Sequence, residues 1–142
     1  MKILIIGGYG TFGGRLAELL SEIEALTLVI AGRSEAKAAT FVGTLAAGAK
    51  KLPLAFDRDA DVDIQIGQLK PDLVIDATGP FQLYGDDSYR VVKACIKHNA
   101  NYMDLADGVQ FVDGIEQFDI EAKARGLFVL SGVSSFPVLT AA

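Results

Sequence analysis

The sequence contains a single cysteine, Cys95, a single histidine, His98, and no tryptophan in 142 residues. One cysteine cannot form a disulfide within the chain, and such usage is typical of proteins from reducing compartments. Because the lone histidine does not belong to a cluster of cysteines and histidines, we do not expect a metal site. Cys95 lies among Val91, Val92 and Ile96, so we interpret it as a small core residue and not as a nucleophile.

Positive charge is also scarce, since 13 lysines and arginines stand against 18 acidic residues, giving a formal net charge of −5. Nucleic acid binding needs clustered basic residues, so this class of partner is not expected. No apolar stretch approaches the ~20 residues of a membrane-spanning helix. The apolar start KILII is interrupted by glycines, unlike a signal peptide. We therefore expect a cytoplasmic protein with no membrane partner.

Short apolar runs are plentiful, in keeping with a hydrophobic fraction of 51%. Most are apolar throughout, which is typical of strands of a parallel sheet that are buried on both faces. The length suits one domain. The predicted strands are KILIIG (2–7), TLVIAG (27–32), KLPLAF (51–56), DLVIDA (72–77), NYMDLA (101–106) and LFVLSG (127–132).

Segments with helical spacing alternate with these strands. They are the segment marked by Leu16, Leu19, Leu20 and Ile23, an alanine-rich stretch at 35–48, a short one at 59–69, the segment marked by Val91, Val92, Cys95 and Ile96, and that marked by Ile115, Phe118, Ala122 and Ala124. Asn99 is a plausible C-terminal signal for the fourth. The alternation predicts an α/β, Rossmann-type doubly wound sheet of about six parallel strands with helices on both faces.

The last residues suggest how the chain is organised. We assign 1–132 to one NAD(P)-binding domain and 133–142 to the start of a connection. In VSSFPVLTAA, Ser134 or Ser135 is placed to cap a helix whose first turn holds Pro137. We therefore expect a C-terminal substrate domain to follow, which would hold a small-molecule substrate.

GGYGTFGG, at 7–14, contains the spacing Gly8-x-Gly10-x-x-Gly13 of the dinucleotide fingerprint. It follows a predicted strand and opens a predicted helix, which is the context that gives the spacing its meaning. The glycines permit a tight turn, a close approach of pyrophosphate and close helix–strand packing. The helix N-terminus offers free N–H groups to the phosphates. We include Thr11 and Phe12, which lie between the last two fingerprint glycines, among the predicted cofactor-binding residues.

The end of the second predicted strand reads Ala31-Gly32-Arg33-Ser34 and has no carboxylate for a ribose 2′-hydroxyl. Arg33 can instead pair with a 2′-phosphate, and Ser34 can add a hydrogen bond. This pattern favours NADP over NAD. The alternative is a solvated arginine beside a serine that caps the next helix.

Further candidates follow the other strands, because ligands of open α/β sheets lie along the carboxyl ends of the strands. Asp57 can accept a hydrogen bond from an adenine amino group, or it can cap the following helix. Thr78, Gly79, Pro80 and Phe81 form a loop that we expect beside the cofactor's ribose and nicotinamide. Asp104 and Asp107 flank the end of the fifth predicted strand, where we favour structural hydrogen bonding over catalysis.

Tyr89 and Lys93 form a Tyr-x-x-x-Lys pattern, which short-chain dehydrogenases use as a general acid and its activator. Gly7-x-x-Gly10-x-x-Gly13 is also their glycine spacing. However, their pair follows the fifth strand of the sheet and this one follows the fourth. We favour an ordinary pair on a helix surface and keep a single-domain short-chain dehydrogenase as an alternative.

Together these motifs resemble the N-terminal NADP-binding domain of saccharopine dehydrogenase-like oxidoreductases. The resemblance rests on GGYGTFGG, AGRS, DLVIDATGPFQLYG, VVKACIKHNANYMDLADG and LFVLSGVSSFPVLTAA, and it spans nearly the whole chain. It implies a Rossmann domain followed by an α/β substrate domain. It also implies cofactor contacts at Gly8, Gly10, Gly13, Arg33, Ser34 and the 78–81 loop.

The sequence therefore predicts the NADP-binding domain of an oxidoreductase that transfers hydride to or from a small substrate, with the cofactor carrying the chemistry. We expect such a domain to bind the cofactor but to turn over little by itself. A non-catalytic module that binds or senses NADPH remains an alternative. A homodimer also remains open.

Overall fold

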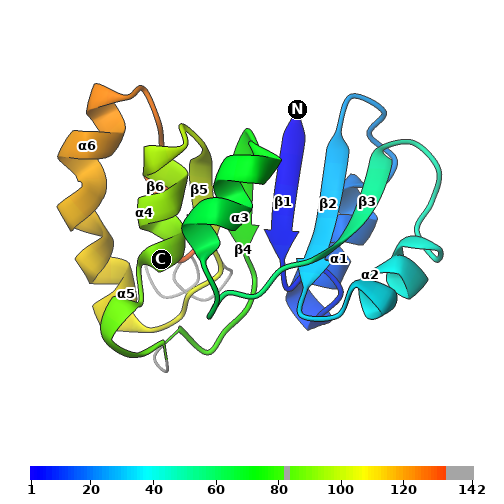
Figure 1. Ribbon diagram of the computed structural model, residues 1–142, viewed down its shortest axis with the longest axis horizontal. Helices are drawn as coiled ribbons and strands as arrows, with labels where there is room; N and C mark the ends of the chain where they lie inside the picture. Colours follow the sequence, from blue (N-terminus) through cyan, green and yellow to red (C-terminus); the bar gives the residue numbers. More distant parts are fainter. Residues whose placement is uncertain (82–83, 134–142) are drawn as a thin grey trace, which may run out of the picture.

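Six strands, all parallel, form one sheet in a computed structural model that describes residues 1–81 and 84–133 (Figure 1). The strands are β1 (Lys2–Ile6), β2 (Thr27–Gly32), β3 (Lys50–Ala55), β4 (Leu73–Asp76), β5 (Asn101–Asp104) and β6 (Val129–Leu130). Their order across the sheet is β3-β2-β1-β4-β5-β6. Five of the predicted apolar runs contain one strand each, and the sixth, 51–56, overlaps β3, which begins one residue earlier at Lys50, so the strand prediction is confirmed.

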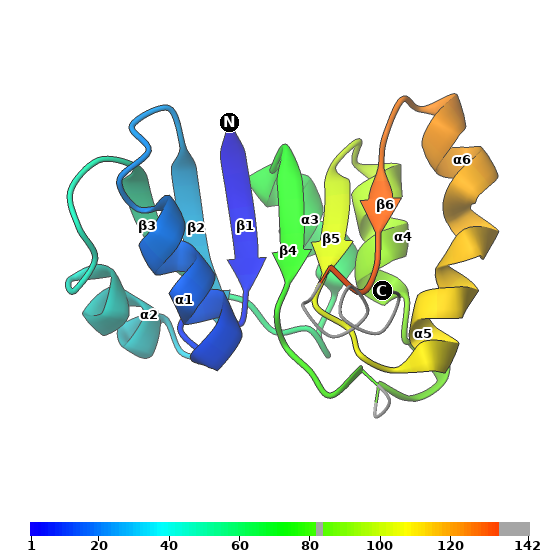
Figure 2. The same ribbon diagram turned by 180° about the vertical axis from the view of Figure 1, so that it is seen from behind.

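Helices cover both faces of the sheet, as predicted. They are α1 (Thr11–Leu20), α2 (Glu35–Val42), α3 (Val62–Leu69), α4 (Arg90–Lys97), α5 (Val109–Asp113) and α6 (Asp119–Ala124), with 3-10 turns η2 (Gly85–Asp87) and η3 (Gly114–Phe118). In Figure 1, α3 and α4 lie in front of the sheet, and Figure 2 shows α1 and α2 on the opposite face. Right-handed crossovers produce this division, because the chain steps one way from β1 to β3 and the other way from β3 to β6.

Two apolar cores flank the sheet, one on each face. Leu4 and Ile6 of β1 face the core beneath α3 and α4. Ile3 and Ile5 face the core beneath α1 and α2. Since consecutive residues of a strand point to opposite faces, a central strand with a core on both sides must be apolar throughout. This explains why the predicted strands lack alternation.

The fifth predicted helix differs from the structure, which divides it among α5, η3 and α6. Ile115 and Phe118 are three residues apart and both pack against the core beneath α4. A 3-10 turn has three residues per turn and aligns such a pair, whereas an α-helix would set them about 60° apart. The Phe118 ring also packs edge-on against Tyr89, with ring centroids 5.3 Å apart. Tertiary packing therefore overrides the continuous helix.

Two other helices are shorter than predicted, and one stop signal is confirmed. α2 ends at Val42 and not at residue 48, and α3 begins only at Val62. Asn99 has a φ of 58°, the left-handed conformation expected of a residue that ends α4. The predicted helix start at Ser134, Ser135 and Pro137 lies outside the described residues.

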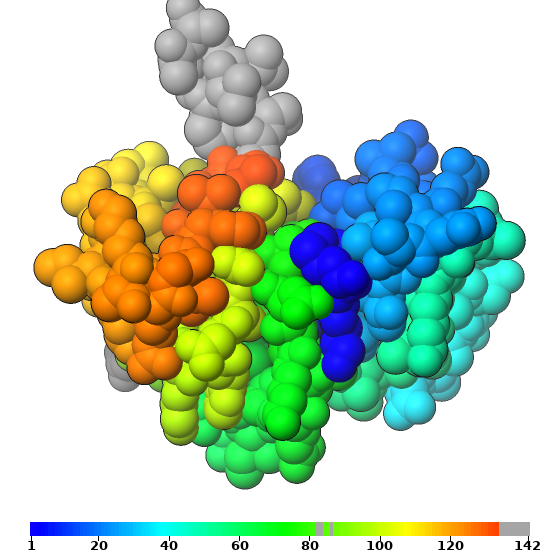
Figure 3. All heavy atoms as spheres, turned by 90° about the horizontal axis from the view of Figure 1, so that it is seen from above, coloured from blue at the N-terminus to red at the C-terminus, as the bar shows by residue number. Residues whose placement is uncertain are grey.

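The N-terminus lies at the middle of one end of the sheet. Its ammonium group donates to the carbonyl of Ala25 at 3.0 Å. Figure 3, seen from above, shows the first residues between the segments that carry β2 and β4. The strands all begin at this end, so their carboxyl ends, which carry the predicted site, lie together at the opposite end.

Candidate functional site

The glycine turn joins β1 to α1, and its geometry separates the glycine that forms the turn from those that permit close packing. Gly7 has a φ of +76°, a conformation that L side chains rarely adopt, and its carbonyl accepts from the N–H of Gly10 at 2.9 Å. A Cβ at Gly13 would lie 2.3 Å from the Gly7 oxygen. A Cβ at Gly8 would lie 2.8 Å from the Ile5 oxygen. Gly7 therefore makes the turn, a role that the predicted spacing gave to Gly8, while Gly8 and Gly13 permit close packing.

The N-terminus of α1 is open to a ligand. Gly10 is its N-cap residue, no side chain in the described part of the chain caps it, and its first turn holds no acidic residue. The first N–H groups of a helix have no partner within the helix and carry a partial positive charge. An anion placed at this end would therefore receive backbone hydrogen bonds.

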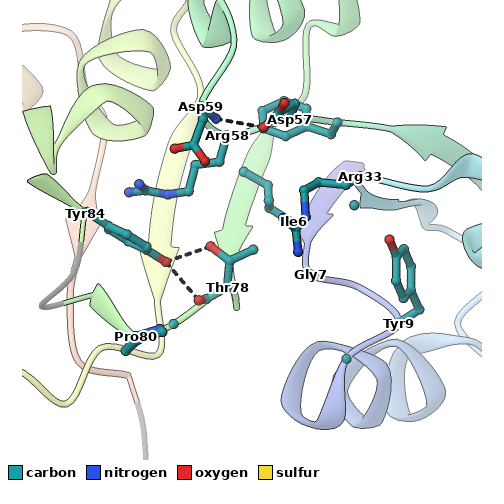
Figure 4. A pocket seen from close by; sticks show the side chains of 14 residues that line it. Ile6, Gly7, Tyr9, Arg33, Asp57, Arg58, Asp59, Thr78, Pro80 and Tyr84 are labelled. Carbon is teal, nitrogen blue, oxygen red and sulfur yellow. Dashed lines mark hydrogen bonds between the residues drawn. The ribbon is translucent and has the colours of Figure 1, made fainter.

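A cleft of about 420 Å³ lies between this turn and the ends of β2, β3 and β4 (Figure 4). Of the predicted cofactor-binding residues, Gly10, Arg33, Asp57, Thr78, Gly79 and Pro80 line it. Residues not predicted also line it: Ile6, Gly7, Tyr9, Gly32, Phe56, Arg58, Asp59 and Tyr84. Four segments distant in sequence thus form one site, because parallel strands end at the same edge of the sheet.

Several predicted residues do not line this cleft. The Gly8 and Gly13 positions lie beneath the turn, and Thr11 lies at the start of α1. Phe12 is 70% exposed and borders a second, smaller hollow of about 130 Å³ beside Pro80 and Phe81. Phe81 itself is buried, with its ring centroid 5.0 Å from that of Phe111.

Ser34 and Arg33 have different surroundings. The Ser34 hydroxyl accepts from the N–H of Lys37 at 3.3 Å and caps α2, which is the alternative role considered for it. Arg33 is exposed, lines the cleft and has no ion pair or side-chain hydrogen bond among the described residues. Its guanidinium can therefore turn to a ligand phosphate without breaking an existing bond.

Asp57 lines the cleft but does not cap α3, so that alternative is wrong. One of its carboxylate oxygens accepts from the N–H of Asp59 at 3.0 Å. The cap is Asp61, which accepts from the N–H of Ile64 at 3.0 Å. A cap must directly precede its helix, and α3 begins four residues later than an Asp57 cap would require.

Tyr9 is a wall residue that sequence reasoning missed. Its ring lies so close to Gly32 that a Cβ there would come within 2.6 Å of the phenol oxygen. That oxygen also accepts from the N–H of Ser34 at 3.1 Å. Tyr9 thereby fixes the glycine turn against the end of β2. The signal was a glycine directly before Arg33, where a side chain would have excluded the ring.

A polar network at the ends of β3 and β4, formed by Arg58, Asp76, Thr78 and Tyr84, was also missed in the sequence. Asp76 is fully buried, and its Oδ1 accepts from the N–H of Thr78 at 3.1 Å and from the Thr78 hydroxyl. Its Oδ2 accepts from Nε of Arg58 at 3.2 Å. The Tyr84 hydroxyl donates to the Thr78 carbonyl at 2.9 Å, as Figure 4 shows. Burial, with the Asp76 charge, raises the pKa of Tyr84 and keeps the phenol protonated.

The Tyr89–Lys93 alternative receives no support from the geometry. The Tyr89 hydroxyl donates to the carbonyl of Phe111 at 2.8 Å, and the two rings stack with centroids 4.7 Å apart. Lys93 pairs with Asp87 at 2.7 Å. Tyr89 is the N-cap residue of α4, partly buried, so it is not the surface pair that we predicted.

Asp104, at the end of β5, is fully buried and serves structure as predicted. Its Oδ1 accepts from the N–H groups of Ala106 at 2.9 Å and Gly132 at 2.8 Å, and from the Ser131 hydroxyl at 2.9 Å. Its Oδ2 and the Tyr102 hydroxyl have no hydrogen bond partner in the described part of the chain. Burial raises the pKa of Asp104, although these hydrogen bonds oppose the shift.

We expect Asp104→Asn to alter how stability depends on pH. A carboxyl whose pKa is raised on folding favours the folded state below its unfolded pKa, and this contribution is lost as pH rises through the folded pKa. The unfolding free energy of the unmodified protein should therefore fall with rising pH relative to the variant. Urea denaturation from pH 4 to 8 measures this difference.

Asp63→Asn is the control with the opposite sign. The hydrogen bond from Lys97 lowers the pKa of Asp63, with His98 adding to the shift. The stability that Asp63 provides is therefore present above its unfolded pKa and lost as pH falls through its folded pKa. A pH-independent difference for Asp104→Asn would contradict the expected role of burial.

The remaining singular residues are accounted for by packing. Cys95 is fully buried, and burial raises the pKa of its thiol, as expected of a core residue. His98 ends α4, with its Nε2 3.0 Å from an Asp63 oxygen.

Residues 1–81 and 84–133 contain no cluster of three or more potential metal ligands. The same residues include no helix that is both long and apolar enough to cross a bilayer.

Residues 3–129 match the family described as the saccharopine dehydrogenase NADP binding domain. No curated protein matches the chain.

Solved structures share the fold at low sequence identity. Apo saccharopine dehydrogenase (L-Glu forming) from Saccharomyces cerevisiae matches with a TM-score of 0.69 and 18% identity over 93% of this chain and 27% of that one. The complex of leucoanthocyanidin reductase with NADPH from Vitis vinifera matches with a TM-score of 0.55 and 15% identity over 90% and 48%. The chain thus spans a quarter to a half of these proteins.

Proposed function

Because the chain belongs to the saccharopine dehydrogenase NADP-binding domain family, we propose that it binds NADP(H) in the cleft beside the glycine turn. The family is one of oxidoreductases, and the domain is its cofactor-binding part. The observation that carries the proposal is the uncapped N-terminus of α1 next to Arg33, whose side chain has no ion pair or hydrogen bond within residues 1–81 and 84–133. These two features offer backbone N–H groups and one mobile positive charge to an anionic ligand.

The residues of the cleft fit such a ligand. The turn at Gly7 and Gly10 exposes main chain, so a diphosphate can approach it without meeting a side chain. Arg33 is placed for the 2′-phosphate, and Asp57, from the end of β3, for the adenine amino group. Thr78, Gly79 and Pro80 form the opposite wall, where the cofactor's ribose and nicotinamide would continue along the sheet edge.

When bound, the nicotinamide cofactor supplies the hydride that is transferred. The residues of this domain hold and orient the cofactor. The helix N-terminus neutralises phosphate charge, and the polar network around Asp76 fixes the strand ends. We assign the substrate to a further domain that follows this one. In this proposal the domain binds cofactor by itself and turns over little substrate.

The test compares the two dinucleotides by isothermal titration calorimetry. We expect NADPH to bind at least about tenfold more tightly than NADH, a difference of about 1.4 kcal/mol, because only NADPH engages Arg33 through its 2′-phosphate. Equal affinity for the two would contradict the preference for NADP. Failure to bind either one would overturn the proposal as a whole.

A further inference from the structure

Arg58 is an arginine held on three sides at the wall of the cleft. Its Nε donates to Asp76 at 3.2 Å, and its Nη2 donates to the carbonyl of Ser88 at 2.9 Å. Its guanidinium carbon lies 3.2 Å from the centroid of the Tyr84 ring. Its side chain is 9% exposed, although the residue lines the cleft. The guanidinium is therefore fixed where it is and cannot swing towards a ligand as Arg33 can.

The charges around the cleft explain why a fixed cation matters there. Two cations, Arg33 and Arg58, line it with two carboxylates, Asp57 and Asp59. The fully buried carboxylate of Asp76 lies behind the wall and pairs with Arg58. Without Arg58, one cation would stand against three carboxylates. A dinucleotide carries its negative charge on the phosphates, and a buried charge is poorly screened by salt.

We propose that Arg58 is a specificity-determining residue of the cleft: it offsets the buried charge of Asp76 and so allows an anionic dinucleotide to bind. The inference rests on the proposed function. Arg58 acts through its field and not by gripping the ligand, because Asp76, Ser88 and Tyr84 already hold its guanidinium. Its contribution therefore increases with the number of negative charges on the ligand.

A purely structural role for Arg58 predicts a different pattern. The polar network links Arg58 at the end of β3 with Asp76 and Thr78 at the end of β4, so the loss of the Arg58 side chain could deform the cleft. Deformation would weaken charged and neutral ligands alike. The charge on the ligand therefore separates the two explanations, and neutralising both partners of the pair separates them a second time.

The experiment measures Kd for adenosine, NADH and NADPH by amide chemical-shift titration of the full 142-residue chain. For Arg58→Met we expect the Kd of NADPH to rise at least about tenfold and that of adenosine by less than about twofold, with NADH between them. Asp76→Asn keeps an acceptor for Thr78 and removes the opposing charge, so the Kd of NADPH should fall. Arg125→Met, which removes a cation directly after α6 and outside the cleft, is the matched control and should change none of the three.

The double substitution Arg58→Met with Asp76→Asn removes both charges. We expect it to return the Kd of NADPH to within about threefold of the unmodified protein. A double variant that binds NADPH as weakly as Arg58→Met, or a similar loss for all three ligands, would overturn the inference. If Arg58→Met does not fold, the double variant and Asp76→Asn decide by the same comparisons.

The failure of this inference can be told from failure of the proposed function. If the unmodified protein binds neither NADPH nor NADH, both are wrong. If it binds NADPH and the variants shift all ligands by the same factor, only the role of Arg58 is wrong.

Discussion

Gly13→Ala is expected to destabilise the domain by about 2 kcal/mol, because the added methyl group meets backbone on the other side of the glycine turn. The new Cβ would lie 2.3 Å from the Gly7 oxygen and 3.1 Å from the Gly8 Cα. Overpacking costs about 1–3 kcal/mol, and an approach of 2.3 Å to a backbone atom belongs at the upper end of this range, whereas the higher helix propensity of alanine returns only about 1 kcal/mol. The clash therefore dominates.

The same substitution should weaken NADPH binding at least about tenfold, since the start of α1 must move away from the turn that receives the phosphates. Urea denaturation measures the first effect and calorimetric titration the second. Gly14→Ala is the matched control, one residue along the same helix. Its Cβ would come within 3.3 Å of the Phe41 ring tip, which can yield because it belongs to a side chain, and would make an ordinary contact of 3.6 Å with the Tyr9 backbone.

If Gly13→Ala and Gly14→Ala had equal effects, close packing of helix on turn would not be the reason for the glycine. A loss of binding without loss of stability would instead assign Gly13 to ligand contact. The structure predicts both losses together, because the same backbone atoms bound the helix and the cleft.

Arg33→Ala is expected to remove most of the preference for NADPH over NADH. A charge-assisted hydrogen bond contributes about 1.5–3 kcal/mol, so the Kd of NADPH should rise by roughly 10- to 100-fold. The Kd of NADH should change little, because its ribose carries no 2′-phosphate. Since Arg33 has no other bond in the described part of the chain, stability should be unaffected within about 0.5 kcal/mol.

Calorimetric titration of both dinucleotides into Arg33→Ala measures this change. Lys50→Ala is the control, because it removes the same charge from an exposed residue at the beginning of β3, the far end of the sheet. An equal loss for NADH and NADPH in Arg33→Ala would show that the arginine serves the shared part of the ligand. Specificity for the 2′-phosphate would then have to come from elsewhere in the cleft.

The sequence was sufficient for the sheet because burial on both faces leaves a plain pattern. β1 and β4 lie between neighbours and beneath helices on each side, so apart from Lys2 and Asp76 at their ends they are apolar with no alternation. The glycine turn was recognisable because a strand precedes it and a helix follows. Its neighbouring glycines have the same propensities, however, so the sequence could not tell that Gly7, and not Gly8, adopts the positive φ.

The residues that were missed depend on partners far along the chain. Arg58 contacts Asp76, Tyr84 and Ser88, which lie 18 to 30 residues away. No periodicity links such positions. One signal was present: Asp76 is a charged residue at the end of an otherwise apolar run, and a buried carboxylate requires a compensating partner. The break at η3 was missed for the same reason, since it depends on Phe118 meeting Tyr89.

Because β1 lies in the middle of the sheet, its two neighbouring strands are synthesised at different times. Ile3 pairs with Leu28 on one side and with Leu73 on the other, so the second neighbour is synthesised 45 residues after the first. At roughly 5–20 residues per second, a ribosome takes about 2–9 s to supply it. During that interval the first strand, KILII, has one edge whose backbone N–H and C=O groups are unpaired. Such an edge can pair with a strand of another nascent chain. Nascent chains synthesised on the same messenger RNA are therefore most prone to associate before residue 73 emerges from the ribosome.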